Sequence, residues 1–112
     1  MGSQLVFCAT NPHAPGTITV MVTDLQGHTL ERGSAKYDPA MEFFNRNAGL
    51  KQIGVSDGPR SLLAATSIDN PNVSQVTIVG SSGEILQHGT LPTGKLYEWL
   101  NSNAGLEKAK AA

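Results

Sequence analysis

The feature that most constrains the fold of this chain is a match between its two halves. When the sequence is shifted against itself by half of its 112 residues, residues 20–50 align with residues 76–106 without a gap, and 10 of the 31 aligned positions are identical. Unrelated segments of ordinary composition would share about two identities. We therefore predict an internal duplication, with one copy in residues 1–56 and a second copy in residues 57–112.

Each copy carries the patterns of three strands. β-branched and other apolar residues alternate with polar ones, or gather in short apolar runs, as strands with one buried face require. Turn-forming residues at 24–27 and 80–83 separate the second strand from the third, so that each copy contains a β-hairpin. The predicted strands are residues 5–9, 17–23 and 28–35 in the first copy and residues 61–65, 75–79 and 84–91 in the second.

A helix follows the third strand in each copy. Asp38 and Pro39 are typical of an N-cap and a first helical residue, and residues 92–93 open the second helix in a similar way. Gly49 and Gly105 predict the left-handed residue that ends a helix. The apolar positions recur at the spacing of one wide helical face. They are Ala40, Met41, Phe43, Phe44 and Ala48, matched by Leu96, Tyr97, Trp99, Leu100 and Ala104.

These patterns predict an α+β fold made of two β-β-β-α repeats, with antiparallel sheet structure and two amphipathic helices packed on one face. Three strands and one short helix leave too much apolar surface exposed to be stable alone. We therefore expect residues 1–112 to form a single domain in which both repeats share one core. Residues 107–112 follow the second helix and are predicted to be a frayed tail or a short helical extension.

Composition narrows the kinds of partner. The formal net charge is −1, which argues against a nucleic-acid partner. The charged fraction is 15%, below the roughly 25% typical of soluble domains, and such a weakly charged surface favours association. No apolar run approaches the roughly 20 residues of a membrane span, and no signal peptide is recognisable. We expect a cytoplasmic homo-oligomer, in its own cell or a host cell, without a cofactor.

The residues that most often carry catalysis are scattered. Cys8 aligns with Ala64 in an apolar run and is interpreted as a small buried hydrophobe, not as a nucleophile. The histidines, His13, His28 and His88, lack the i,i+4 spacing of a helical metal site. We therefore assign no catalytic residue and no metal ligand.

Four polar residues are the candidate site. Glu42 and Asn45 in the first helix recur as Glu98 and Asn101 in the second, on the side of each helix away from the apolar face. One explanation is a local hydrogen bond inherited from the duplicated ancestor. The other is that the two helices present equivalent polar patches to a symmetric ligand or to a neighbouring subunit.

These observations favour a non-enzymatic binding protein that acts by protein–protein contact or by sequestering a small polar ligand, in the manner of a phage or viral accessory protein or an inhibitor. The alternative is a small metal-dependent hydrolase or nuclease. The order of three strands, a helix and a fourth strand resembles the opening of the RNase H-like fold. The resemblance implies that Glu42 and Asp69 stand where that family keeps two metal-binding acids. The first strand contains no aspartate.

Overall fold

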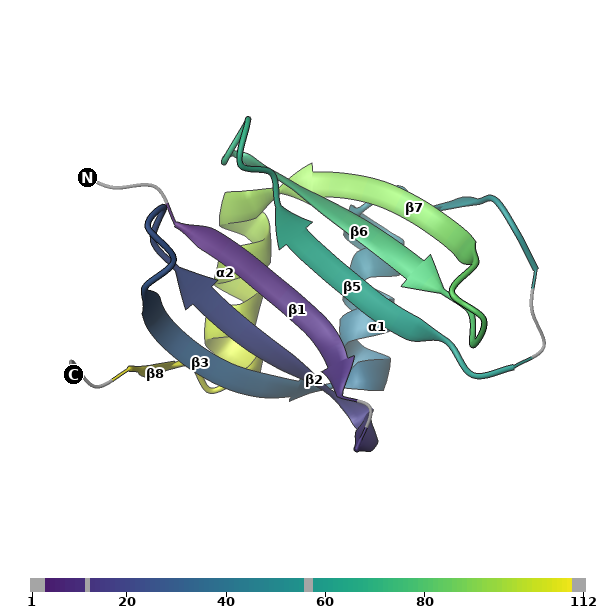
Figure 1. The fold of residues 1–112 in the computed structure, drawn as a ribbon, viewed down its shortest axis with the longest axis horizontal. Coiled ribbons are helices and arrows are strands. Elements are labelled where there is room, and N and C mark those ends of the chain that lie inside the picture. Colours follow the sequence, from purple (N-terminus) through teal and green to yellow (C-terminus); the bar gives the residue numbers. More distant parts are fainter. Residues whose placement is uncertain (1–3, 12, 56–57, 110–112) are drawn as a thin grey trace.

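The computed structural model describes residues 4–11, 13–55 and 58–109, which form one antiparallel sheet and two helices (Figure 1). The strand order is β4-β7-β6-β5-β1-β2-β3-β8. The α+β class is therefore confirmed, with all strands in a continuous sheet. The elements in chain order are β1 (Leu5–Asn11), β2 (Ala14–Thr23), β3 (Thr29–Lys36), α1 (Tyr37–Asn47), β4 (Lys51–Gln52), β5 (Ser61–Thr66), β6 (Val73–Val79), β7 (Ile85–Pro92), α2 (Thr93–Asn103) and β8 (Glu107–Lys108).

The six predicted strands and both predicted hairpins are present. Each hairpin turn ends on a glycine in the left-handed region, Gly27 with φ of 89° and Gly83 with φ of 85°. A glycine adopts this conformation without a steric penalty, which explains why both turns carry it. Gly49 (φ 56°) and Gly105 (φ 55°) end the helices in the same region, as predicted.

The middle of the sheet is the antiparallel pair of β1 and β5, where Cys8 lies opposite Ala64. Each of these residues stands half a chain length from the other, and we call two such residues counterparts. Threonine hydroxyls extend the pairing at both ends. The Oγ1 of Thr10 accepts a hydrogen bond from a backbone N–H of β5 at 2.8 Å, and the Oγ1 of Thr66 accepts one from β1 at 2.9 Å. The two threonines are counterparts, so the pairing of β1 with β5 is extended in the same way at each end.

The end of each helix crosses to the other half of the chain. β4 follows α1 but pairs with β7, whereas β8 follows α2 but pairs with β3. The carbonyl of Ala48 accepts a hydrogen bond from the N–H of Thr90, and that of Ala104 accepts one from the N–H of Ser34, each at 3.0 Å. Each half therefore supplies the edge strand that pairs with the outermost long strand of the other half.

Two identical glycines make this crossing sterically feasible. A Cβ atom on Gly33 would lie 2.3 Å from the carbonyl oxygen of Ala104, and one on Gly89 would lie 2.2 Å from that of Ala48. No side chain fits at such a distance, because both neighbours are backbone atoms. The identities at these positions are thus explained by a close approach of helix end and strand.

Both helices lie behind the sheet in Figure 1 and run in opposite directions. Their buried residues belong to one cluster that also contains inward-facing residues of β1, β2, β5 and β6. On the sheet side this cluster includes Val6, Cys8, Ile18, Val20, Val22, Leu62, Val76 and Ile78, and on the helix side Ala40, Phe43, Phe44, Leu96 and Leu100. Buried residues of both halves therefore belong to one hydrophobic cluster.

The structure corrects the prediction for the start of the first helix. Asp38 is not the N-cap, because α1 begins at Tyr37 and its N-cap is Lys36, which makes no side-chain capping hydrogen bond. The reason is that Lys36 still pairs with Thr17 in the sheet, so β3 runs into the helix without a loop. Asp38 lies in the first turn, where its negative charge interacts favourably with the helix dipole.

The prediction for residues 107–112 was also wrong where it can be compared. Glu107–Lys108 is the edge strand β8, not a frayed tail or a helical extension, and Lys51–Gln52 forms the matching strand β4. Residues 110–112 lie outside the described residues. Two-residue strands carry no periodic pattern, so their pairing is set by the position in which each helix ends.

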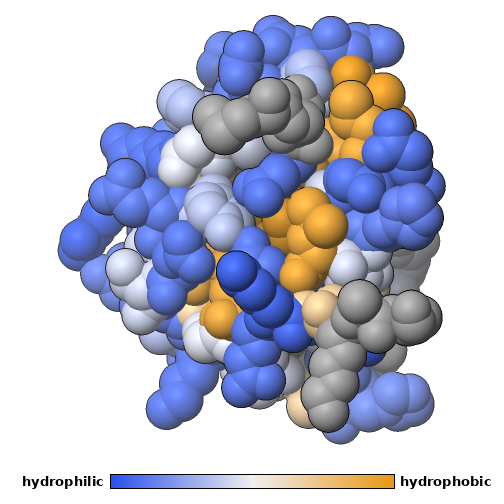
Figure 2. Space-filling model, turned by 90° about the vertical axis from the view of Figure 1, so that its left-hand side faces the viewer, coloured by the Kyte–Doolittle hydropathy of each residue, from blue (hydrophilic) through white to orange (hydrophobic). Residues whose placement is uncertain are grey.

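Both edges of the sheet are poor templates for a further strand. β4 and β8 contain two residues each, all of them exposed and three of them charged. Short charged edge strands are a common protection against strand addition. On the side of the molecule that carries β3 and β8, hydrophilic residues cover most of the surface, with apolar residues in small areas between them (Figure 2).

The close approach of helix end and strand generates a stability prediction. We expect Gly89→Ala to lower the free energy of unfolding by about 1–3 kcal/mol, because the new methyl group must push the Ala48 carbonyl away from Thr90. Gly94→Ala is the matched control, since a Cβ at Gly94 meets nothing within 4 Å and the residue lies in the first turn of α2. Urea denaturation of both variants provides the comparison, and equal stabilities would contradict the steric argument.

Candidate functional site

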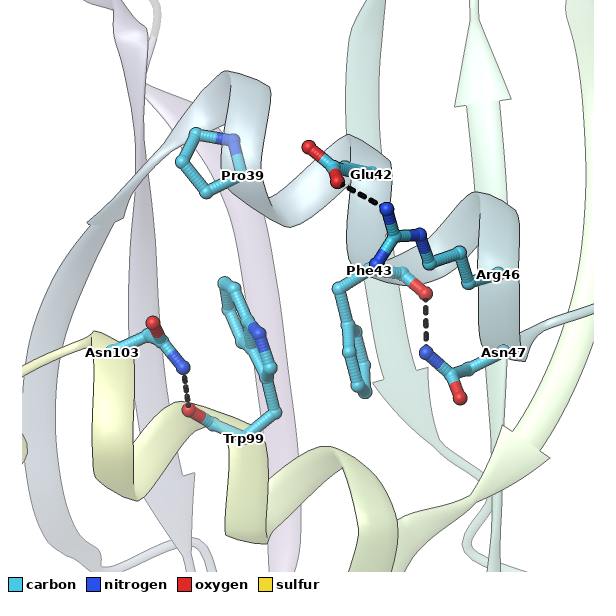
Figure 3. Close-up of a pocket in the computed structure, with 7 residues that line it drawn as sticks. All are labelled: Pro39, Glu42, Phe43, Arg46, Asn47, Trp99 and Asn103. Carbon is cyan, nitrogen blue, oxygen red and sulfur yellow. Dashed lines mark hydrogen bonds and ion pairs between the residues drawn. The ribbon is translucent and has the colours of Figure 1, made fainter.

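A pair of aromatic rings bridges the two helices. Phe43 of α1 and Trp99 of α2 stack with their ring centroids 4.9 Å apart and an angle of 22° between the planes (Figure 3). Phe43 is 9% exposed, and Trp99 is partly buried against the core. The two residues are counterparts and belong to the predicted apolar face. Their stack forms the centre of a groove between α1 and α2, which we call the helix groove.

A pocket of about 320 Å³ opens on the α1 side of this stack. The guanidinium of Arg46 lies 2.7 Å from the carboxylate of Glu42 in an exposed i,i+4 ion pair on its wall (Figure 3). Such a pair contributes little to stability, about 0.3–0.5 kcal/mol, but it places both charges at the pocket. The lining residues are Pro39, Glu42, Phe43, Arg46, Asn47, Trp99 and Asn103.

A second pocket, of about 240 Å³, opens on the α2 side. All six of its lining residues are counterparts of residues that line the first pocket. The pairs are 95 with 39, 98 with 42, 99 with 43, 102 with 46, 103 with 47, and 43 with 99. The helix groove therefore offers two related pockets that share the aromatic stack. The lining residues of the second pocket are Phe43, Lys95, Glu98, Trp99, Ser102 and Asn103.

Two asparagines hold their amides in the same orientation in the groove. The Nδ2 of Asn47 donates to the carbonyl of Phe43, and the Nδ2 of Asn103 donates to the carbonyl of Trp99, each at 2.8 Å (Figure 3). Because this bond uses the amide nitrogen, the Oδ1 atom of each side chain is left as an acceptor. Each pocket thus combines a carboxylate, an amide oxygen and aromatic surface.

The four residues predicted from the sequence divide into two kinds. Glu42 and Glu98 line the helix groove, whereas Asn45 and Asn101 are exposed and line neither pocket. Asn101 instead acts on Tyr97 of its own helix, where it lowers the pKa of the phenol. The structure therefore brings the two glutamates to related pockets and separates the two asparagines from them.

Tyr97 also connects the halves of the chain. Its hydroxyl donates to the Oε1 of Glu31 on β3 at 2.5 Å. This hydrogen bond is the main reason that the pKa of Tyr97 is raised, with burial as a second contribution and Asn101 acting in the opposite direction. The phenol is accordingly held as a neutral donor that fastens α2 to β3.

The residues that the sequence analysis missed are Arg46, Lys95 and the asparagine pair Asn47 and Asn103. Asn47 and Asn103 are identical between the halves, but each stands two residues before the glycine that ends its helix, where a repeated residue has a structural explanation. Their hydrogen bonds to carbonyls four residues earlier are a further structural role. Their place in the pockets depends on how the helices lie side by side, which no pattern within one helix shows.

Cys8 is buried, 3% exposed, and its interpretation as a small hydrophobe is confirmed. Desolvation raises the pKa of its thiol to about 12, so the reactive thiolate is absent at neutral pH. Among the described residues no group of three or more His, Cys, Asp or Glu side chains is arranged to hold a metal ion. Glu42 is paired with Arg46, and Asp69 is exposed in the connection between β5 and β6.

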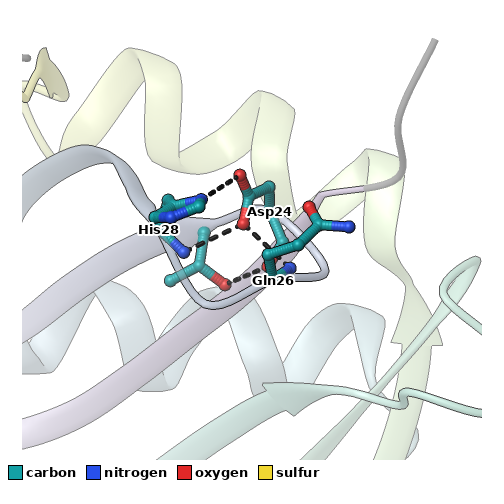
Figure 4. A network of polar contacts seen from close by, with 4 residues as sticks. Asp24, Gln26 and His28 are labelled. Carbon is teal, nitrogen blue, oxygen red and sulfur yellow. Dashed lines mark hydrogen bonds and ion pairs between the residues drawn. The ribbon is translucent and has the colours of Figure 1, made fainter.

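The hairpin turn between β2 and β3 contains a compact network around Asp24 (Figure 4). Its Oδ1 accepts hydrogen bonds from the backbone N–H groups of Gln26 and His28, both at 2.9 Å, and its Oδ2 lies 3.1 Å from the His28 ring. The hydrogen bond from the His28 backbone is the main reason that the pKa of Asp24 is lowered. The ionised carboxylate therefore fixes this turn.

The lowered pKa predicts how the turn responds to acid. A carboxyl group with a lowered pKa stabilises the fold fully above its unfolded value of about 4, and this stabilisation is lost as pH falls through the folded value. We expect wild type to exceed Asp24→Asn in stability at pH 7 and the difference to close below about pH 4. Thermal unfolding of both proteins between pH 7 and about pH 3 measures this difference in stability. Asp69→Asn, at an exposed carboxylate, is the control, and a gap for Asp24 that stays constant with pH would contradict the prediction.

None of the described helices is long and apolar enough to cross a membrane. No protein-family model matches the sequence, and neither the curated proteins nor the solved structures yield a match to the chain.

Proposed function

We propose that this protein is a non-enzymatic binding protein that contacts a protein partner, a second copy of itself included, through the helix groove. The observation that carries the proposal is the pair of related pockets on either side of the Phe43–Trp99 stack. Tryptophan and arginine are enriched in the central part of protein interfaces, and Trp99 and Arg46 both line the first pocket.

Two further observations support the helix groove over other surfaces. The sheet edges are two-residue strands with exposed, charged side chains, which disfavours strand addition. The turn at Asp24 already satisfies its own carboxylate within the hairpin. The helix groove, by contrast, contains acceptors and aromatic surface that the chain itself does not fully use.

We also propose that the chain arose by duplication of one β-β-β-α repeat, with residues 1–56 and 57–112 as the copies and both helices packed on the same face of the sheet. The support is the recurrence of unusual features at counterpart positions. Four features recur in this way. They are the glycines with positive φ, the threonines that extend the pairing of β1 with β5, the glycines that contact the helix ends, and the two-residue edge strands.

Charge reversal in the helix groove tests the proposed function. We expect native mass spectra of the wild-type protein to show a species heavier than the monomer, either an oligomer or a complex with a retained polypeptide. Glu42→Lys combined with Glu98→Lys places new positive charges in both pockets, beside Arg46 and Lys95. Like charges at an interface oppose binding, so the double variant should weaken this association about tenfold or more.

The control places lysines on the opposite face of the sheet. Thr19 and Gln75 are exposed counterparts on β2 and β6, so Thr19→Lys combined with Gln75→Lys alters charge away from the groove. We expect this variant to associate like wild type. A bare monomer in the wild-type spectrum, or equal loss in both double variants, would refute the helix groove as the interface.

A circular permutant tests whether the two halves are equivalent. Residues 53–60 connect β4 to β5, and joining Ala112 to Met1 would connect β8 to β1 through residues 109–112 and 1–4, a linker of the same length. With new ends between residues 56 and 57, the permutant should unfold cooperatively, within about 1–2 kcal/mol of wild type in urea.

The control permutant is opened between residues 92 and 93, where the buried Thr93 donates its N–H to Asn72 at 2.9 Å. It should be much less stable, because the cut separates β7 from α2 inside the core. If both permutants lost stability to the same extent, the halves would not be interchangeable and the duplication proposal would fail.

A further inference from the structure

The two pockets of the helix groove differ at one pair of counterparts. On α1, Glu42 is followed four residues later by Arg46, whose guanidinium lies 2.7 Å from the carboxylate. On α2, Glu98 is followed four residues later by Ser102, which carries no charge and cannot make the same ion pair. Among the described residues, Glu98 has no ion pair. The α2 pocket therefore lacks the guanidinium that its counterpart holds.

The surroundings of Glu98 are suited to a positively charged group supplied by another molecule. Within about 240 Å³ the pocket combines the Glu98 carboxylate, the hydroxyl of Ser102 and the Asn103 side chain with the surface of Trp99. The Nδ2 of Asn103 is occupied by the Trp99 carbonyl, so its Oδ1 is left to accept a hydrogen bond. These groups are hydrogen-bond acceptors beside an aromatic ring, an environment that favours a planar cation with several N–H donors.

We propose that the pocket beside Glu98 binds the guanidinium of an arginine side chain supplied by the protein partner. This inference rests on the proposed function of the helix groove and adds the chemistry of its ligand. The incoming guanidinium takes the place relative to Glu98 that Arg46 takes relative to Glu42. It adds contact with Trp99, which the side chain at position 102 does not provide.

The positive charge of Lys95 is the reason that the pocket favours an arginine side chain over a lysine side chain. Lys95 also lines the pocket, and its positive charge offsets the negative charge of Glu98. The two side chains form no ion pair in the described chain. A compact ammonium gains little from such a balanced pocket. A guanidinium has a planar fork that bonds to a carboxylate and an amide oxygen and also stacks on an indole, and these contacts depend less on net charge.

The test uses the full chain, labelled with ¹⁵N, and N-acetyl-arginine methylamide as the probe. The chain has a single tryptophan, so the indole N–H signal of Trp99 reports directly on the helix groove. We expect saturable shifts of Trp99 and of neighbouring amides. The citrulline analogue, which has the same shape without the charge, and the lysine analogue should bind about two- to fivefold more weakly or not measurably.

Two reciprocal variants sharpen the test. Ser102→Arg supplies α2 with the residue that α1 has, so it should pair with Glu98 and abolish binding of the arginine probe. Arg46→Ser removes the internal guanidinium from Glu42 and should raise the number of bound probes from one to two. Glu98→Gln should weaken binding about two- to fivefold. All three side chains are exposed, and unchanged amide signals away from the groove would verify the fold.

The outcomes separate this inference from the function on which it rests. Arginine and citrulline probes that bind equally, a Ser102→Arg variant that still binds, or the absence of any saturable shift would each overturn the arginine pocket. If Glu42→Lys with Glu98→Lys still abolished association in that case, the helix groove would remain the interface with a different chemistry. If association were also unaffected, both proposals would fail together.

Discussion

The contact on which the structure depends is the close approach of each helix end to a strand of the other half. Only a glycine at positions 33 and 89 lets the carbonyls of Ala104 and Ala48 come near enough to receive hydrogen bonds from the sheet. That contact determines where each helix ends, and the chain can then pair only with the nearest strand of the opposite half. The edge strands β4 and β8 follow from it.

The helix groove is a consequence of the same crossing. Since each helix runs toward the other half, α1 and α2 lie side by side in opposite directions, and equivalent positions from both meet in the middle. Phe43 and Trp99 are such positions, and their stack divides the space between the helices into two. The proposed duplication accounts for the two related pockets. The substitutions that break the symmetry, Arg46 against Ser102 and Pro39 against Lys95, make the pockets chemically different.

Much of the fold could be predicted from the sequence because strands and hairpins leave local patterns, and the match between the halves allowed each pattern to be interpreted twice. The edge strands could not, because two residues show no alternation and their partners are distant. The helix start was misjudged at Asp38, since a strand that continues into a helix needs no capping residue. Within the candidate site, Glu42 and Glu98 were found by their exposure and repetition. Asn45 and Asn101 share both properties, and only the packing of one helix beside the other distinguishes them.

The exchange of edge strands also affects the order in which the chain can fold during synthesis. β3 is complete once residue 36 has been made, but its outer neighbour β8 consists of residues 107–108. The hydrogen bond from Ser34 to Ala104 likewise waits for the end of α2. Residues 5–36 can therefore form their hairpin on the ribosome, yet the outer edge of β3 stays unpaired until residues 104–108 have emerged. Over that interval the nascent chain depends on the charged residues of β3, Glu31, Arg32 and Lys36, to resist pairing with a neighbour.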